Sequence, residues 1–200
     1  MSNIKFKDVN AVAIIPAKGN STRLPKKNFQ IINSKSLVEY AIDYAKSSTY
    51  IKKIYVSTDS NEIKEIAKKN KVLSFDRPKD LLGEAEVADI YVDLVKKISN
   101  DSITHVVGLQ PDHPDRQNKL DDMINYFIEK KYMDLFTVNK NGTRNGSVRI
   151  FKAENVLSGQ MSRRVGAMLD DCTNVENKWQ LDLANKRILE GDYYEKNWKY

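Results

Sequence analysis

The chain has 200 residues, and its 33 lysine and arginine residues exceed its 27 aspartate and glutamate residues by six. This length suits one domain with a buried core. Basic residues never exceed two in a row, which argues against a nucleic-acid-binding arm. The longest apolar run, residues 11–15, is too short to cross a bilayer. The single cysteine, Cys172, excludes an internal disulfide, so we expect a cytoplasmic protein. From the short apolar and basic runs we expect no membrane or nucleic-acid partner.

Short apolar runs that are typical of buried strands alternate with segments of helical periodicity along the chain. Strands are predicted at residues 12–15, 53–57, 71–75, 104–109, 135–138 and 148–151. Helices are predicted at residues 37–46, 61–69, 87–98, 120–130 and 180–189. This alternation predicts an α/β fold: a single-domain, Rossmann-like, mostly parallel sheet with helices on both faces.

The loop after the first predicted strand has an unusual composition. Residues 16–28 hold one glycine, several small polar side chains and four cations. Small residues let backbone N–H groups approach phosphate oxygens, and cations neutralise them. Because ligands of such sheets bind beyond the carboxyl ends of the strands, this loop is a candidate phosphate site. A solvated basic loop remains the alternative, since the loop is neither a Gly-x-Gly-x-x-Gly motif nor a Walker A motif.

The same segment resembles a known signature. Residues 15–28 read Ile-Pro-Ala-Lys-Gly-Asn-Ser-Thr-Arg-Leu-Pro-Lys-Lys-Asn. They are similar to the Ile-Pro-Ala-Arg-Gly-Gly-Ser-Lys-Arg-Leu-Pro-Gly-Lys-Asn of the cytidylyltransferases that make CMP-sialic acid, to which the CMP-Kdo synthetases are related. Further elements of that family are matched in order by residues 56–63, 77–81, 109–116 and 145–146. The resemblance therefore covers nearly the whole chain.

The resemblance implies a nucleotidyltransferase domain over residues 1–200 that binds CTP in the cytoplasm. The residues it implies for nucleotide binding are Pro16, Ala17, Lys18, Gly19, Asn20, Ser21, Thr22, Arg23, Lys27, Asp59, Arg77 and Gln110. Lys18, Arg23 and Lys27 would act in catalysis by neutralising the departing pyrophosphate. For Asp59, a turn-forming role is the alternative.

The metal site is where the chain departs from the family. The family ends its active site with Asp-x-Asp, and the matching positions here hold Asn174 and Glu176. Asp112 resembles a metal-binding aspartate of the CMP-Kdo synthetases. We therefore expect Asp112 and Glu176 to hold Mg²⁺, with Asn174 as a weaker ligand, because Mg²⁺ prefers a few carboxylates plus substrate phosphates. His113, next to Asp112, is predicted to be structural rather than catalytic.

The family also carries a long dimerisation arm, and residues 139–145 leave almost nothing in its place. This absence predicts a smaller acceptor, or one that is held by charge. The compact length, the lost Asp-x-Asp and the missing arm together resemble the CTP:phosphoglutamine cytidylyltransferases. That resemblance implies N-phospho-L-glutamine as the acceptor, which would yield CDP-L-glutamine and pyrophosphate in capsule modification. Arg149, Arg163 and Arg164 are the candidates for binding its anionic groups. A homodimer is left open.

Three alternative functions remain at this point. The first is a CMP-sugar acid synthetase of the sialic acid or Kdo type, which attaches CMP to a hydroxyl. The second is a non-catalytic CTP-binding module, which the broken Asp-x-Asp favours. The third is a nucleic-acid binder, which the net charge and the aromatic residues 193–200 favour.

Overall fold

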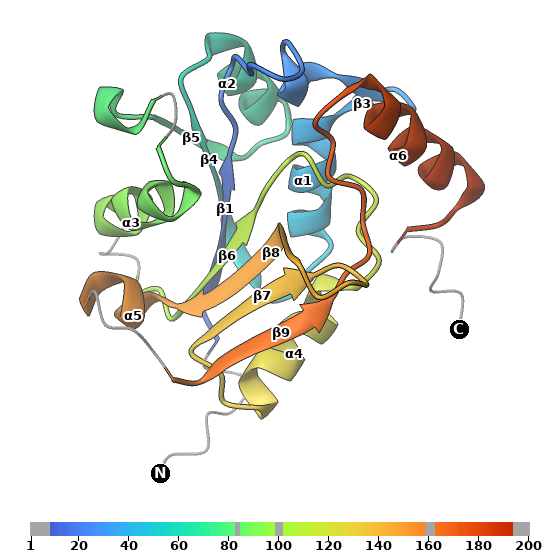
Figure 1. Ribbon diagram of the computed structural model, residues 1–200. Helices are drawn as coiled ribbons and strands as arrows, with labels where there is room; N and C mark the ends of the chain where they lie inside the picture. The colour runs from blue at the N-terminus through green and yellow to red at the C-terminus, as the bar shows by residue number, and fades with distance from the viewer. Residues whose placement is uncertain (1–8, 83–84, 99–101, 159–162, 194–200) are drawn as a thin grey trace.

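The computed structural model describes residues 9–82, 85–98, 102–158 and 163–193 (Figure 1). Most of the aromatic C-terminal segment, residues 194–200, lies outside the described residues. None of the helices in the described ranges is long and apolar enough to cross a membrane.

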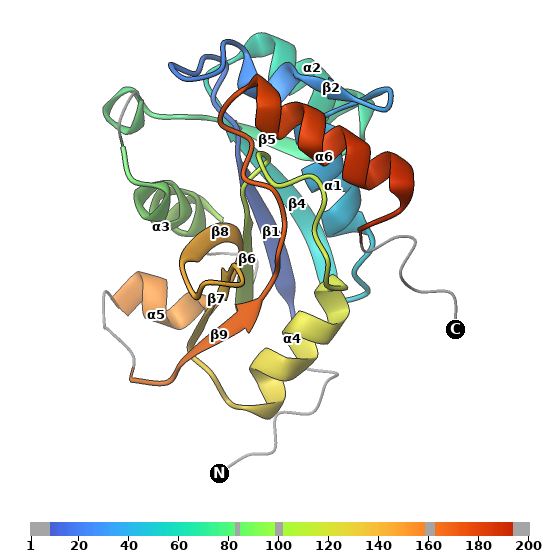
Figure 2. The same cartoon turned by 45° about the vertical axis from the view of Figure 1, so that its right-hand side comes forward.

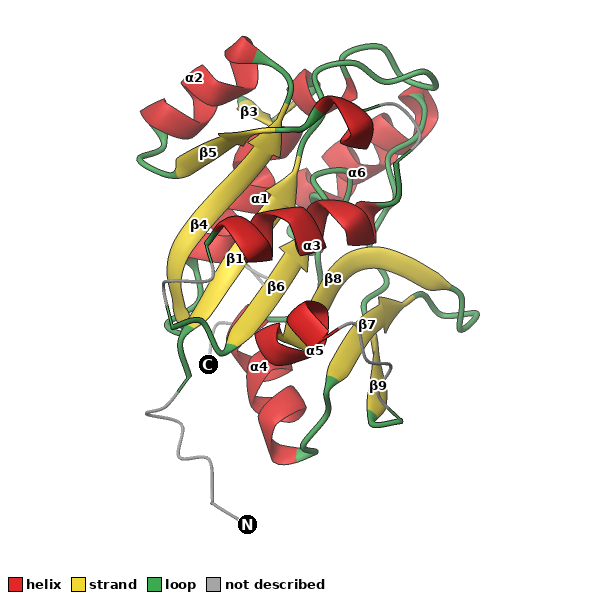
Figure 3. Cartoon of the chain, turned by 90° about the vertical axis from the view of Figure 1, so that its left-hand side faces the viewer, coloured by secondary structure: helices red, strands yellow, loops and turns green. Residues whose placement is uncertain are grey.

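A seven-stranded sheet in the order β5-β4-β1-β6-β8-β7-β9 forms the centre of the molecule (Figure 3). Its strands are β1 (Ala11–Pro16), β4 (Ile51–Thr58), β5 (Leu73–Asp76), β6 (His105–Leu109), β7 (Asp134–Val138), β8 (Arg144–Lys152) and β9 (Val165–Leu169). Only β8 runs antiparallel to its neighbours β6 and β7, so the sheet is mostly parallel, as predicted. The carboxyl ends of β1, β4 and β6 therefore meet at one edge.

Helices cover both faces of this sheet (Figure 1). They are α1 (Leu37–Lys46), α2 (Asn61–Lys69), α3 (Val87–Lys97), α4 (Leu120–Glu129), α5 (Ala153–Ser158) and α6 (Lys178–Glu190). On one face, α1, α2, α4 and α6 bury their apolar sides against alternate sheet residues such as Ile15 and Leu109. On the other face, α3 and α5 pack against Ile14, Val106 and their neighbours. This two-sided burial explains why β1 and β6 are apolar throughout.

Several elements differ from the sequence prediction. The third strand begins at Leu73 rather than residue 71, because Lys71 takes a left-handed conformation (φ 58°) after α2 ends. Strand β9 and the short helix α5 were not predicted. The Val-Gly-Ala-Met-Leu of β9 is short and lies at the sheet edge, where Val165 and Leu169 are exposed, so its pattern is weak.

The segment between β1 and α1 also holds structure that the sequence analysis missed. A short 3₁₀ helix at Lys27–Phe29 is followed by a hairpin of β2 (Ile31–Ile32) and β3 (Lys35–Ser36). Ser36 and Glu39 then form a capping box that starts α1. The C-terminal α6 lies beside β2 (Figure 2), which brings the segment before α6 close to the loop that follows β1.

Candidate active site

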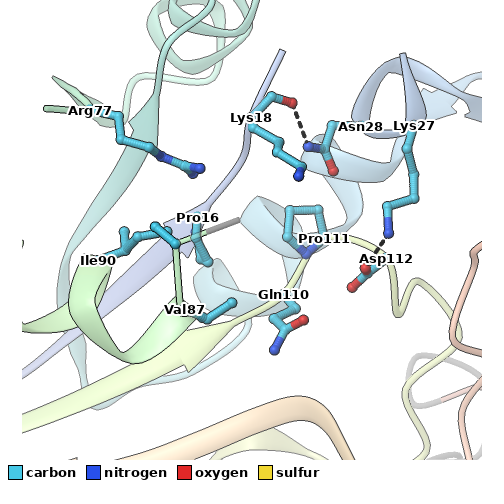
Figure 4. A pocket seen from close by; sticks show the side chains of 11 residues that line it. Pro16, Lys18, Lys27, Asn28, Arg77, Val87, Ile90, Gln110, Pro111 and Asp112 are labelled. Carbon is cyan, nitrogen blue, oxygen red and sulfur yellow. Dashed lines mark hydrogen bonds and ion pairs between the residues drawn. The ribbon is translucent and has the colours of Figure 1, made fainter. Parts of the chain in front are cut away.

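A first pocket of about 120 Å³ opens at the carboxyl edge of the sheet (Figure 4). Segments that follow three different strands contribute to it: residues 16–28 after β1, Arg77 after β5, and residues 110–112 after β6. The lining residues are Pro16, Lys18, Lys27, Asn28, Arg77, Ala85, Val87, Ile90, Gln110, Pro111 and Asp112. The structure thus brings together five of the predicted nucleotide-site residues and one predicted metal ligand.

Backbone and amide contacts hold the loop after β1 in a defined path. Ala17 donates its N–H to the Ser57 carbonyl (2.9 Å), which prolongs the β1–β4 pairing. The buried Asn28 donates to the Lys18 carbonyl (2.7 Å), and Asp59 accepts from the Gly19 N–H (2.7 Å). A side chain at Gly19 would collide with Ser60, so glycine is required where the loop passes β4. Asp59 therefore holds the loop after β1 against the end of β4.

The outer part of the loop is open to solvent. Asn20, Thr22 and Arg23 are exposed, and the Asn20 side chain accepts from the Ser21 N–H (2.9 Å). The loop therefore lies beside the first pocket with its polar groups accessible to a ligand.

Arg77 contributes a buried guanidinium to the first pocket. It is 9% exposed, and one of its nitrogens donates to the Ser57 carbonyl (3.1 Å). Its Nε is buried without a hydrogen-bond partner among the described residues. Burial lowers the pKa of Arg77, and Asp59 opposes that effect. An unsatisfied buried N–H costs free energy, and the side chain that carries it lines the first pocket.

The predicted metal ligands meet at Lys27. Its Nζ lies 2.6 Å from Asp112 Oδ2 and 3.2 Å from Glu176 Oε1. Arg23 also reaches Glu176, at 3.2 Å. The two carboxylates are 64 residues apart (176 − 112) in the sequence, and the single ammonium between them shows that they face one another. Asn174, the weaker ligand expected, is exposed.

The buried ring of His113 contacts the carboxylate of Asp112. That ring is 1% exposed, and its Nδ1 lies 2.9 Å from Asp112 Oδ1. Burial by itself would raise the pKa of Asp112, but His113 and Lys27 together hold that pKa well below its usual range. Asp112 is therefore ionised at neutral pH. His113 orients this carboxylate and is too buried to meet a substrate, in line with the structural role predicted for it.

These residues fit a magnesium ion only together with a substrate. No group of three or more metal-binding side chains occurs in the described part of the chain. Two carboxylates that converge on one cation form an oxygen-only donor set. Mg²⁺ accepts such a set when substrate phosphates and water complete its octahedron.

A second pocket of about 360 Å³ adjoins the first and shares Gln110 and Val87 with it. It lies between α3 and β8. Its other lining residues are Glu86, Ala88, Tyr91, Arg144, Asn145, Gly146, Val148 and Arg149. Gly146 has a left-handed backbone (φ 75°), and a side chain there would collide with Gln110. The Asn-Gly pair therefore shapes the boundary between the two pockets.

A wide bulge in β8 brings two arginines into the second pocket. Phe136 of β7 pairs with Arg149, whereas Val138, two residues on, pairs with Arg144, five residues back. The extra residues in β8 place Arg144 over the Phe136 ring (4.8 Å) on the same side as Arg149. The sequence prediction selected Arg149 and missed Arg144, because it began this strand at residue 148 and left Arg144 in the preceding connection, whereas β8 begins at Arg144.

The two pocket arginines differ in their partners. Arg149 forms a forked pair with Asp134, at 3.0 and 2.7 Å. No carboxylate lies within ion-pair distance of Arg144 among the described residues. Burial lowers the pKa of Arg144, and the charge of Arg149 lowers it further. Arg144 is thus the cation of this pocket that is least compensated by the protein.

The other two predicted acceptor residues lie elsewhere. Arg163 and Arg164 are exposed and precede β9, whose first residue pairs with the first residue of β7. The amino ends of β7 and β9 are at the edge of the sheet opposite to Pro16 and Gln110. The structure places these two arginines outside both pockets, and their adjacency in sequence gave no information about which end of a strand they occupy.

The buried Arg116 links the backbone segments that line the two pockets. It is fully buried and donates to the carbonyls of Gln110 and His113 in one loop and of Ser147 in the β8 bulge. Its guanidinium lies 4.9 Å from the centre of the Tyr44 ring. This residue belongs to the recognised motif, but only the structure shows that it joins the loop after β6 to β8.

Fold and site together define an α/β protein with a cation-rich loop and paired carboxylates at the carboxyl ends of its parallel strands. A family model described as cytidylyltransferase matches residues 12–196, so the chain belongs to that family. The family resemblance that the motifs predicted is thereby confirmed.

Curated relatives share part of their length with this chain. A CMP-N,N'-diacetyllegionaminic acid synthase of Legionella pneumophila is 33% identical over 110 residues, which are 53% of this chain and 47% of that protein. A 3-deoxy-manno-octulosonate cytidylyltransferase of Rickettsia typhi is 30% identical over 136 residues, or 66% and 54%. A pseudaminic acid cytidylyltransferase of Campylobacter jejuni is 40% identical over 58 residues, or 29% and 25%. The chain spans about half or less of the length of these relatives.

Solved structures show the same fold at low sequence identity. A CMP:2-keto-3-deoxy-manno-octonic acid synthetase complexed with CTP superposes with a TM-score of 0.71 at 12% identity, covering 91% of this chain and 99% of that one. A cytidylyltransferase from Leptospira borgpetersenii gives 0.70 at 19% identity, covering 91% and 87%. The predicted Rossmann-like α/β fold is confirmed.

Proposed function

We propose that this chain transfers CMP from CTP to a hydroxyl group of a sugar acid and releases pyrophosphate. The observation that carries the proposal is the pair of adjoining pockets that share Gln110. The first is bordered by the cations of the β1 loop and suits a nucleoside triphosphate. The second holds Arg144 and Arg149 and suits a carboxylate, because guanidinium groups bind carboxylates through paired hydrogen bonds.

The reaction joins the hydroxyl oxygen of the acceptor to the α-phosphorus of CTP and breaks the bond from that phosphorus to the oxygen that bridges it to the β-phosphate. The hydroxyl proton passes to solvent water. Pyrophosphate departs with the bonding electrons. Lys18, Arg23 and Lys27 all belong to the loop after β1. They would stabilise the negative charge that develops on the departing pyrophosphate in the transition state. Gln110, on the shared boundary, would align the two substrates.

Asp112 and Glu176 would hold Mg²⁺, the cofactor expected from the sequence. Held there, Mg²⁺ would supply Lewis-acid stabilisation of the charge on the phosphates. Lys27 must leave the two carboxylates for this to happen, since its ammonium now contacts both. Asp112 is ionised at neutral pH, as a metal-binding carboxylate must be.

A sugar acid is favoured over N-phospho-L-glutamine as the acceptor. The relatives reported above are named for 3-deoxy-manno-octulosonate, diacetyllegionaminic acid and pseudaminic acid, and they give phosphoglutamine no support. The argument for a small acceptor rested on the missing arm. The connection between β7 and β8 is indeed a tight turn, in which Gly142 donates to the Asn139 carbonyl (2.9 Å). A short turn also leaves the second pocket accessible, so it does not require a small acceptor.

Pyrophosphate release tests the proposal. The protein is incubated with each of the four nucleoside triphosphates and with 3-deoxy-manno-octulosonate, pseudaminic acid or N-phospho-L-glutamine. We expect release with CTP and a sugar acid, and a single phosphodiester signal in the phosphorus NMR spectrum of the product. A diphosphate linkage would restore the phosphorylated acceptor. If no pair releases pyrophosphate while CTP still binds, the chain is a nucleotide-binding module.

Metal removal tests the cofactor separately. Activity should disappear with excess EDTA and return when MgCl₂ is added in excess over the chelator. An unchanged rate in EDTA would contradict the assignment of Asp112 and Glu176 to a metal.

A further inference from the structure

Tyr91, which the sequence did not single out, lines the second pocket on the side of α3. It lies on α3, and its ring packs 5.7 Å from the ring of Phe151. The side chain is only 4% exposed. At its far end the ring rests on Gly108 of β6, where any side chain would collide with the ring and its hydroxyl. The position of the hydroxyl is therefore determined by the packing of α3 on the sheet.

The Tyr91 hydroxyl lies next to the pocket arginines. Gly108, on which it rests, pairs directly with Arg149 in the register of β6 and β8. Arg149, Arg116 and Arg144 all act electrostatically on this hydroxyl. Burial raises the pKa of Tyr91 further than these arginines lower it, so the group remains a protonated donor at neutral pH.

This donor is not used by the protein. Among the residues that the structure describes, none forms a hydrogen bond with the Tyr91 hydroxyl, whereas the hydroxyls of Tyr40, Tyr44 and Tyr50 all have partners. A tyrosine buried to this degree usually finds one, because an unsatisfied polar group costs about 1–3 kcal/mol. A hydroxyl held rigidly in a pocket beside two arginines is suited to a ligand oxygen.

We propose that Tyr91 is a specificity-determining residue whose hydroxyl donates a hydrogen bond to an anionic oxygen of the acceptor, the group whose charge Arg144 and Arg149 compensate. The inference rests on the proposed function for the acceptor's place in the reaction. The shared chemistry is that of a carboxylate or a phosphate oxygen. An acceptor without an anionic group would leave the hydroxyl and Arg144 unpaired in the pocket, and it would therefore bind poorly.

The experiment compares wild type with Tyr91→Phe, which removes one oxygen and leaves the packing on Gly108 intact. With CTP and 3-deoxy-manno-octulosonate, we expect KM for the acceptor to rise about tenfold or more, since hydrogen bonds to charged groups contribute about 1.5–3 kcal/mol. The kcat and the dissociation constant for CTP should stay within twofold. Tyr50→Phe is the matched control, because its hydroxyl bonds Asn125 (2.6 Å) away from both pockets.

A binding arm separates this inference from the proposed function. Both proteins are titrated with inorganic phosphate and with pyruvate, a simple carboxylate, in the presence of a non-hydrolysable CTP analogue. Weaker binding by Tyr91→Phe supports the inference even if no sugar acid is a substrate, and the better-bound probe identifies the anion. Equal acceptor KM and equal probe binding in the two proteins would overturn it. So would a wild-type protein that neither uses an acceptor nor binds either probe beside the analogue.

Discussion

The two pockets are built in different ways. The first is formed by loops that directly follow strands β1, β5 and β6, so its residues occur in short continuous motifs. The second is formed by the side of α3 and by a bulge in β8, and its polar residues are separated by whole elements. The comparison teaches that a site at the carboxyl edge of a parallel sheet can be predicted from its sequence, whereas a site on the face of that sheet depends on register.

The largest expected effect comes from the residue that joins the two pockets. Replacing Arg116 with leucine leaves the carbonyls of Gln110, His113 and Ser147 without their donor. At about 1–3 kcal/mol for each buried unsatisfied group, we expect the free energy of unfolding to fall by about 3 kcal/mol or more. Urea unfolding measures this. Arg23→Leu, at an exposed position, should change stability by less than about 0.5 kcal/mol. If Arg116→Leu were as stable as Arg23→Leu, the three hydrogen bonds of Arg116 would not stabilise the fold.

The second prediction concerns the first pocket. Lys27→Ala should lower kcat/KM about 10²–10³-fold, because loss of one group that stabilises developing charge costs about 2.7–4 kcal/mol. Lys26→Ala is a matched control, since the side chain of Lys26 is 67% exposed and pairs only loosely with Glu62. Steady-state pyrophosphate release measures both. A similar loss in the two variants would mean that general loop charge, rather than the position of Lys27, supports the reaction.

The third prediction concerns the second pocket. Arg144→Gln keeps a planar polar side chain but removes a charge that has no ion-pair partner among the described residues. We expect KM for the acceptor to rise about tenfold to a hundredfold, with the affinity for CTP unchanged. Lys140→Gln, in the adjacent turn, removes a cation that is 77% exposed and should have no such effect. If Arg144→Gln weakened CTP and acceptor equally, the two pockets would not be separate subsites.

The smallest effect on acceptor binding is expected at the amino end of β9. The double variant Arg163→Gln, Arg164→Gln removes two exposed charges at the amino end of β9. Acceptor KM should change by less than about twofold, because exposed charges at a distance beyond the Debye length are screened in physiological salt. Measurement at 150 mM salt tests this. A clear rise in KM would place these arginines in the acceptor site and would contradict the assignment of that site to the second pocket.

The sequence by itself determined the α/β class, the cation-rich loop after β1, and the order of six of the sheet strands and five of the helices. The strands of such a sheet are apolar on both faces, and the loop residues are contiguous, so short-range patterns were sufficient. It also pointed to Asp112 and Glu176, which the structure brings to one ammonium.

Only the tertiary structure decided how those residues combine. The β8 bulge that brings Arg144 beside Arg149, the burial of Arg116 under both pockets and the contact of Tyr91 with Gly108 all join residues from different elements. Such contacts depend on strand register and on the packing of a helix against a sheet. Neither leaves a local pattern in the sequence, because each is set by the fit of surfaces that are distant along the chain.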